Sequence, residues 1–203
     1  MAIETKVKLV EQLFDRLEIE IKNFQRNTRL QCVSGCGGKC CTTPNIDASP
    51  LEFLPWAFHL FLNGQAENML DELKQSTHSL CHIYKPVSIV DDTNGDCSNY
   101  KYRGLICRLF GYAASRDSLG KLRLATCKII KENQAENYYA ATVAISNGLY
   151  VPIFSDYYMH LAQIDFKLAK TMLPVNEALK RAIEEVLHYY AYRPFPSGLK
   201  VTA

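Results

Sequence analysis

The residues of this chain best suited to chemistry are its eight cysteines. One group lies in a short glycine-rich stretch and the other is spread over the middle of the chain: Cys32, Cys36, Cys40 and Cys41, then Cys81, Cys97, Cys107 and Cys127. Residues 1–7 mix acidic and basic side chains and lack the uninterrupted apolar run of a signal peptide. We therefore expect a cytoplasmic protein with reduced thiols, in which a cysteine cluster indicates a metal site more often than a disulfide framework.

The spacing of the cysteines limits the choice of metal. Small structural zinc sites usually contain paired C-x-x-C knuckles, and this sequence has none. Cys40 and Cys41 are adjacent, so their side chains diverge and suit two metals, or two irons of one cluster, better than one tetrahedral ion. Eight thiols could supply two four-thiolate sites or one polynuclear centre. We expect an iron–sulfur cluster, for example [4Fe-4S], with zinc as the alternative.

Two separated motifs resemble a known cysteine-cluster family. The matching positions of the second motif, C-x-x-Y-x-x-R-P-x-x-C-R-x-F, are Cys97, Tyr100, Arg103, Cys107, Arg108 and Phe110. Gly104 stands where that motif has proline, and the family's C-x-x-C-x-x-C-C is widened here to C-x3-C-x3-C-C over 32–41. Over about residues 30–112 the chain is similar to the YkgJ-like family, described as a zinc- or iron-chelating domain. A similar cysteine motif occurs in the flagellin lysine-N-methylase, which is regarded as an iron–sulfur protein, and this resemblance favours iron.

Three basic residues lie within a few positions of the candidate ligands: Lys39, Arg103 and Arg108. A divalent ion with four thiolates, or a [4Fe-4S] cluster in its 2+ state with four thiolates, carries a net charge of about minus two. We expect these cations to screen that charge or to donate hydrogen bonds to sulfur, which also raises a cluster's reduction potential. The alternative is that the arginines hold loop carbonyls or form surface ion pairs.

The elements that must position the cysteines are mostly helical. Apolar residues with a helical spacing predict a long amphipathic helix before the first cysteine: Val7, Val10, Phe14, Leu17, Ile21 and Phe24. Ser49, Pro50 and Glu52 form a helix-start signature, which predicts a helix over 50–63 that Pro55 bends and Gly64 ends. A further short helix is expected over 65–76.

The segment from 81 to 127 reads as loops and short strands. Candidate strands are 87–90, 105–106 and 122–126, with a turn at 92–95. Helical periodicity returns after Lys131, with Pro174 separating the last two helices and an irregular tail from 193. The predicted fold is a mainly α single domain over 1–203, whose metal-binding segment at about 30–130 is flanked by N- and C-terminal helices.

Composition excludes several classes of function. A formal charge of +2 with dispersed lysines and arginines does not favour nucleic-acid binding. The longest apolar stretch, 51–62, is too short to cross a membrane. We expect electron transfer or catalysis at a cluster, with no catalytic residue assigned and a protein or small molecule as partner. The alternative is a zinc-stabilised module that binds a protein through its helical surface.

Overall fold

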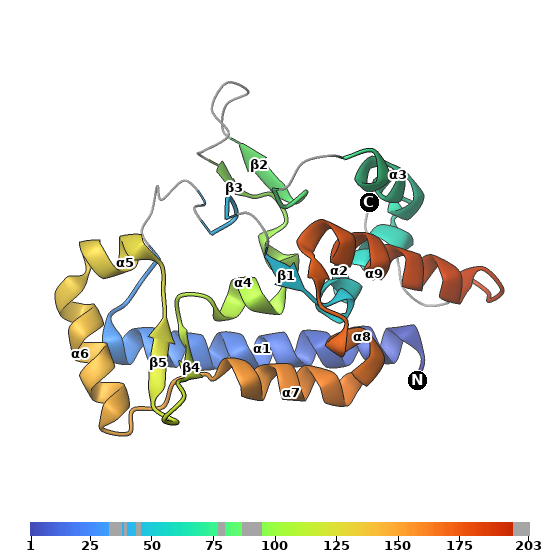
Figure 1. Ribbon diagram of the computed structural model, residues 1–203. Coiled ribbons are helices and arrows are strands. Elements are labelled where there is room, and N and C mark those ends of the chain that lie inside the picture. Colours follow the sequence, from blue (N-terminus) through green and yellow to red (C-terminus); the bar gives the residue numbers. More distant parts are fainter. Residues whose placement is uncertain (33–37, 39, 44–45, 77–79, 87–94, 197–203) are drawn as a thin grey trace.

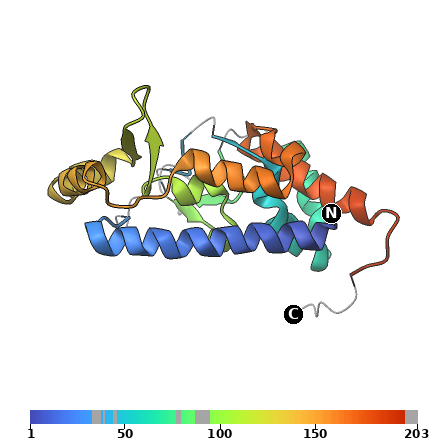
Figure 2. The same ribbon diagram turned by 90° about the horizontal axis from the view of Figure 1, so that it is seen from below.

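A long N-terminal helix, α1 (Ile3–Thr28), forms the base of the computed structural model (Figure 1). Every apolar residue of the predicted pattern is buried in it, which confirms that prediction. The helix ends at Arg29, whose φ of 58° is left-handed and whose N–H donates to the carbonyl of Gln25. At 1.5 Å per residue α1 is about 39 Å long, and Figure 2 shows that it extends along most of the molecule. The structure describes residues 1–32, 38, 40–43, 46–76, 80–86 and 95–196.

The other helices pack at both ends of α1 and along it. At the end near its N-terminus lie α2 (Leu54–Leu62), α3 (Ala66–Gln75), α8 (Phe166–Lys170) and α9 (Val175–Tyr190), and α7 (Phe154–Ile164) runs beside α1 (Figures 1 and 2). Trp56, Phe53 and Leu179 are among the largest fully buried side chains there. Full burial of such side chains stabilises the fold by about 1.5–3 kcal/mol each, so this group of helices is the main core.

A smaller core surrounds the C-terminal end of α1. It is built from β4 (Ala113–Arg116), β5 (Leu122–Ala125), α5 (Lys128–Asn133) and α6 (Ala135–Ser146). Phe24 and Leu30 contribute buried side chains to it, next to Leu124 and Ile145. Because α1 supplies residues to both cores, it holds the two ends of the molecule together.

The described strands form three two-stranded antiparallel pairs. β4 pairs with β5, β1 (Asp47–Ala48) pairs with β6 (Leu173–Pro174), and β2 (Tyr84–Pro86) pairs with β3 (Gly95–Cys97). In the last pair Tyr84 lies opposite Cys97. Figure 1 shows a short helix, α4 (Leu105–Leu109), between α1 and the β2–β3 pair. The middle of the chain therefore forms a layer above α1.

The mainly α fold class is confirmed, and two local predictions are wrong. Residues 105–106 begin α4 and are not a strand, because Leu105 and Leu109 stand four apart and both bury their side chains. The helix predicted over 50–63 is a 3-10 turn, η1 (Pro50–Phe53), followed by α2. Pro55 lies in the first turn of α2, where proline is tolerated, so it does not bend a continuous helix.

Other predicted strands and loops are either confirmed or lie outside the described residues. The strand over 122–126 is confirmed as β5. The candidate strand at 87–90, most of the turn at 92–95 and the end of the tail lie outside the described residues. None of the described helices has the length and apolar character needed to span a membrane.

Candidate metal centre

Six described cysteines line one cavity of about 130 Å³. They are Cys32, Cys40, Cys41, Cys81, Cys97 and Cys107. No disulfide joins any two cysteines of the described part of the chain. The cavity far exceeds the roughly 10–15 Å³ that one water molecule needs. The fold thus brings thiols from distant parts of the sequence to one place.

The first group of thiols is held by loop contacts on either side of the cavity. Just before Cys32, the backbone of Gln31 exchanges two hydrogen bonds with the Gln134 side chain, at 3.0 and 2.7 Å. Cys41 closes a turn by donating its N–H to the Gly38 carbonyl at 2.7 Å. Gly38 has a φ of +65°, and a Cβ there would lie 2.6 Å from the carbonyl oxygen of Gly95. Only glycine fits this position, because the turn carrying Cys40 and Cys41 lies directly against β3.

The second group is fixed by short regular elements. Cys97 ends β3, and Cys107 lies in α4 between the buried Leu105 and Leu109. The Asn176 side chain accepts from the N–H of His82 and donates to the Leu80 carbonyl, each at 2.8 Å. Asn176 belongs to α9, so this pair of bonds attaches the backbone on both sides of Cys81 to the main core.

The thiols of the cavity influence one another electrostatically. A hydrogen bond from the Cys41 thiol lowers the pKa of Cys40 to about 6, and the same bond, with burial, raises the pKa of Cys41. Burial, followed by the negative charge of neighbours such as Cys81, raises the pKa of Cys107 to about 12. Burial also raises the pKa of Cys81 and of Cys97. Several thiolates can therefore coexist in this cavity only with a compensating positive charge, which a bound metal supplies.

Arg103 and Arg108 both line the same cavity. The Arg103 guanidinium lies 3.4 Å from the Glu18 carboxylate and 3.8 Å from the ring centre of Tyr100. Its charge contributes to the lowered pKa of Cys40 and opposes the rise that burial causes in the pKa of Cys97. Its Nε–H is buried without a hydrogen-bond partner among the described residues, and such a donor suits an inorganic or cysteine sulfur.

Arg108 has a different environment. Its Nε and Nη2 donate to the carbonyls of Arg103 and Lys101, at 3.1 and 2.5 Å. Its guanidinium also lies 4.4 Å from the ring centre of Phe14. Arg108 thus holds loop carbonyls, which was the alternative role considered for it, while its charge stays beside the cysteines.

Three of the predicted site residues are not among the described residues that line the cavity. Cys36 and Lys39 lie outside the described residues. Cys127 precedes α5, where its sulfur accepts the N–H of Ile130 at 3.4 Å, and it packs against the smaller core. It is not among the residues that line the cavity. The grouping of Cys127 with the other cysteines therefore has no support from the fold.

A second, largely apolar pocket of about 300 Å³ opens beside the cysteines. Cys40, Cys41 and Cys107 form part of its wall, together with Ile46 and Phe110. Sequence reasoning missed this pocket, although Phe110 belongs to the second cysteine motif. Three of the cysteine side chains are therefore reached from two cavities.

The geometry bears on the type of metal centre. In the described segments, no three His, Cys, Asp or Glu side chains form a group suited to one metal ion. The thiols are instead distributed over the wall of the cavity. Ligands of a polynuclear cluster bind different irons, so they stand further apart than the ligands of one tetrahedral zinc. The six thiols thus share one cavity, and no three of the described side chains of these types form a site for a single ion.

Comparisons with known proteins identify no relative of this chain. No protein-family model, no curated protein and no solved structure matches this chain. The resemblance to the YkgJ-like family therefore stays a prediction from the two cysteine motifs.

Gly104, which replaces the proline of the family motif, is required by packing. A Cβ at this position would lie 2.9 Å from Cζ of Phe53 and 3.0 Å from Oε2 of Glu52. We expect Gly104→Ala to lower the free energy of unfolding by about 1–3 kcal/mol, the usual cost of overpacking. Urea denaturation, followed by the fluorescence of Trp56, would measure it.

The control for this prediction is a double-mutant cycle. If the contact with Phe53 causes the loss, Gly104→Ala should cost less in a Phe53→Leu background than in the parent protein. Equal costs in both backgrounds would show that the contact with Phe53 does not cause the loss.

Proposed function

We propose that the protein holds an iron–sulfur cluster in the cavity of six cysteines and uses it for electron transfer or for catalysis at the cluster. The observation that carries this proposal is the convergence of Cys32, Cys40, Cys41, Cys81, Cys97 and Cys107 on one cavity. Cysteine thiolates are the usual ligands of such clusters, and four suffice for a [4Fe-4S] centre. Two of the six are then available for other roles.

The residues around the six cysteines also support a cluster. The pKa values of Cys81, Cys97 and Cys107 are raised, so these thiols need a nearby positive charge to become thiolates. The irons of a cluster would supply that charge. Arg103 would balance the remaining negative charge and donate its unpartnered Nε–H, which raises a cluster's reduction potential. The apolar pocket at Phe110 would admit the partner, a protein or a small molecule. A cytoplasmic location fits this chemistry, because thiolate ligands must stay reduced.

Zinc is the second candidate, and the type of donor is compatible with it. Four thiolates suit zinc as well as iron. The cavity joins the turn at Cys40 and Cys41, the β2–β3 pair and α4, and a structural zinc would stabilise such a junction. In that case the helical surface would bind a protein partner and the metal would have no redox role.

Purification without oxygen, followed by visible spectroscopy and elemental analysis, distinguishes the two. We expect a brown protein with broad violet-to-blue absorption that dithionite bleaches, and with iron and acid-labile sulfide in similar amounts. A colourless protein with stoichiometric zinc would contradict the cluster and support the structural module.

A further inference from the structure

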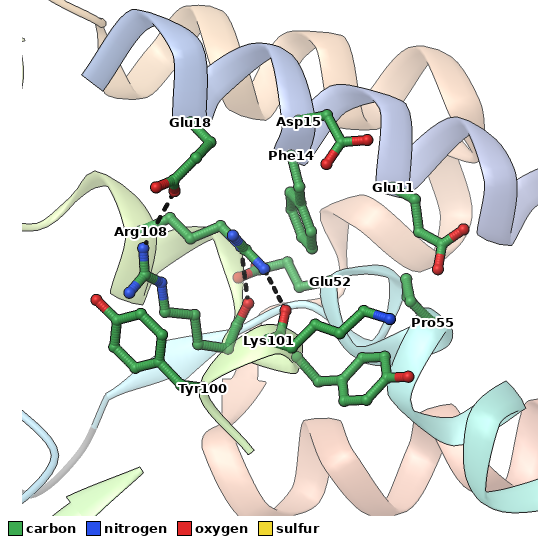
Figure 3. A pocket seen from close by; sticks show the side chains of 11 residues that line it. Glu11, Phe14, Asp15, Glu18, Glu52, Pro55, Tyr100, Lys101 and Arg108 are labelled. Atoms are coloured by element: carbon green, nitrogen blue, oxygen red, sulfur yellow. Dashed lines mark hydrogen bonds and ion pairs between the residues drawn. The ribbon is translucent and has the colours of Figure 1, made fainter. Parts of the chain in front are cut away.

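A second polar cavity, of about 430 Å³, lies between α1 and the segment from Tyr100 to Arg108. Figure 3 shows Glu11, Asp15 and Glu18 of α1 on one side of this cavity, and Tyr100, Lys101 and Arg108 on the other. Tyr100, Arg103 and Arg108 line both this cavity and the one that holds the cysteines. Its volume lies within the range of small-molecule sites.

The wall formed by α1 is acidic. Glu11, Asp15 and Glu18 follow an i, i+4, i+7 spacing, which places them on one face of the helix. Glu18 is already paired with Arg103 at 3.4 Å. Neither Glu11 nor Asp15 forms an ion pair with a residue that the structure describes. Two carboxylates on this wall are therefore available to a ligand.

The opposite wall is basic. The ammonium of Lys101 lies 5.2 Å from the ring centre of Tyr102 and has no ion-pair partner within the described ranges. Arg108 donates to two backbone carbonyls, so its positive charge is not matched by a bound carboxylate.

A fourth carboxylate, Glu52, does not alter this balance. Its two oxygens accept hydrogen bonds from Ser49 and from the backbone of Ile106, so the fold already uses it. What remains is two unpaired carboxylates facing two unmatched cations across a cavity. A simple cation would meet Lys101 and Arg108, and a simple anion would meet the carboxylates, so a ligand with both charges is matched best.

We propose that this cavity binds a small zwitterion of the α-amino-acid class, with its ammonium at Glu11 and Asp15 and its carboxylate at Lys101. Charge-assisted hydrogen bonds of this kind are the strong ones in proteins. The rings of Phe14 and Tyr100 and the ring of Pro55 supply apolar surface for the ligand's side chain. The proposed ligand contacts involve no cysteine, although Tyr100, Arg103 and Arg108 line both cavities.

The test is a titration of the full-length, anaerobically purified protein with the twenty common amino acids, by calorimetry. Each amino acid that binds is compared with the amine that lacks its carboxylate and with the acid that lacks its amino group. We expect saturable binding of at least one amino acid and binding at least tenfold weaker for both truncated compounds. Asp15→Asn and Lys101→Gln should each raise the dissociation constant by about tenfold or more.

The matched controls are Asp71→Asn on α3 and Lys128→Gln on α5, both exposed and not among the residues that line the cavity. They should leave the dissociation constant unchanged. The proposal is overturned if no amino acid binds, if an amine or an acid alone binds as tightly, or if the Asp15 and Lys101 variants bind as well as the controls. Metal content is measured on the same samples, so failure of the zwitterion site and failure of the cluster can be told apart.

Discussion

Replacement of Cys107 by serine should remove most of the bound metal, whereas replacement of Cys127 by serine should leave the metal content unchanged. Cys107 lines the cavity between two buried leucines of α4, so its sulfur cannot be replaced by a neighbour without moving the helix. Loss of an outer-shell partner alone typically costs 10–100-fold in metal affinity, and loss of a ligand should cost at least about 100-fold. Elemental analysis after desalting would measure the effect.

Cys127→Ser is a matched control because serine preserves the local structure. The Cys127 sulfur accepts the N–H of Ile130 at the start of α5, and a serine hydroxyl is a preferred acceptor at that position. Both variants exchange one partly buried thiol for a hydroxyl. If Cys127→Ser loses as much metal as Cys107→Ser, Cys127 is also a ligand and the cavity does not define the ligand set.

The helices could be predicted from the sequence because their apolar residues recur over many turns. In α1 the six residues of the predicted pattern are all buried. The short strands gave no such signal, since β1 and β6 have two residues each and their pairing joins positions far apart in the chain. The helix α4 was misread as a strand because five residues barely exceed one turn.

The candidate site was predictable in its residue types but not in its geometry. The two cysteine motifs contain five of the six thiols of the cavity, and Arg103 and Arg108 belong to the second motif, whereas Cys81 lies between the motifs. Cys127 was included only to complete an even number, which spacing cannot test. The acidic wall at Glu11 and Asp15 was missed because a polar helix face usually meets water, and only the fold places it opposite Lys101.

Glu52→Gln should lower the free energy of unfolding by about 2–3 kcal/mol, the cost of leaving buried donors without an acceptor. Glu52 is 1% exposed. Its Oε1 accepts from the N–H and the hydroxyl of Ser49, at 2.8 and 3.1 Å, as the helix-start signature predicts. Its Oε2 accepts the N–H of Ile106 at 3.2 Å and so connects η1 to α4. A glutamine has one acceptor oxygen and must present its NH₂ group to the donors of the other side.

The same substitution should remove a pH dependence whose sign is fixed by burial. Burial raises the pKa of Glu52 despite the hydrogen bonds from Ser49 and Ile106. Above the pKa of the unfolded chain the native state then binds more protons than the unfolded state, so the contribution of this group to stability falls as pH rises toward its native pKa. The stability of the parent protein relative to Glu52→Gln should therefore decline as pH increases from about 4.3, the usual value for glutamate. Urea titrations of both proteins at several pH values measure this difference. The control is Glu67→Gln, at an exposed position of α3, which should show neither the loss of stability nor its dependence on pH. If the stability of the parent protein relative to Glu52→Gln rises with pH instead, the Glu52 carboxylate is stabilised in its charged form.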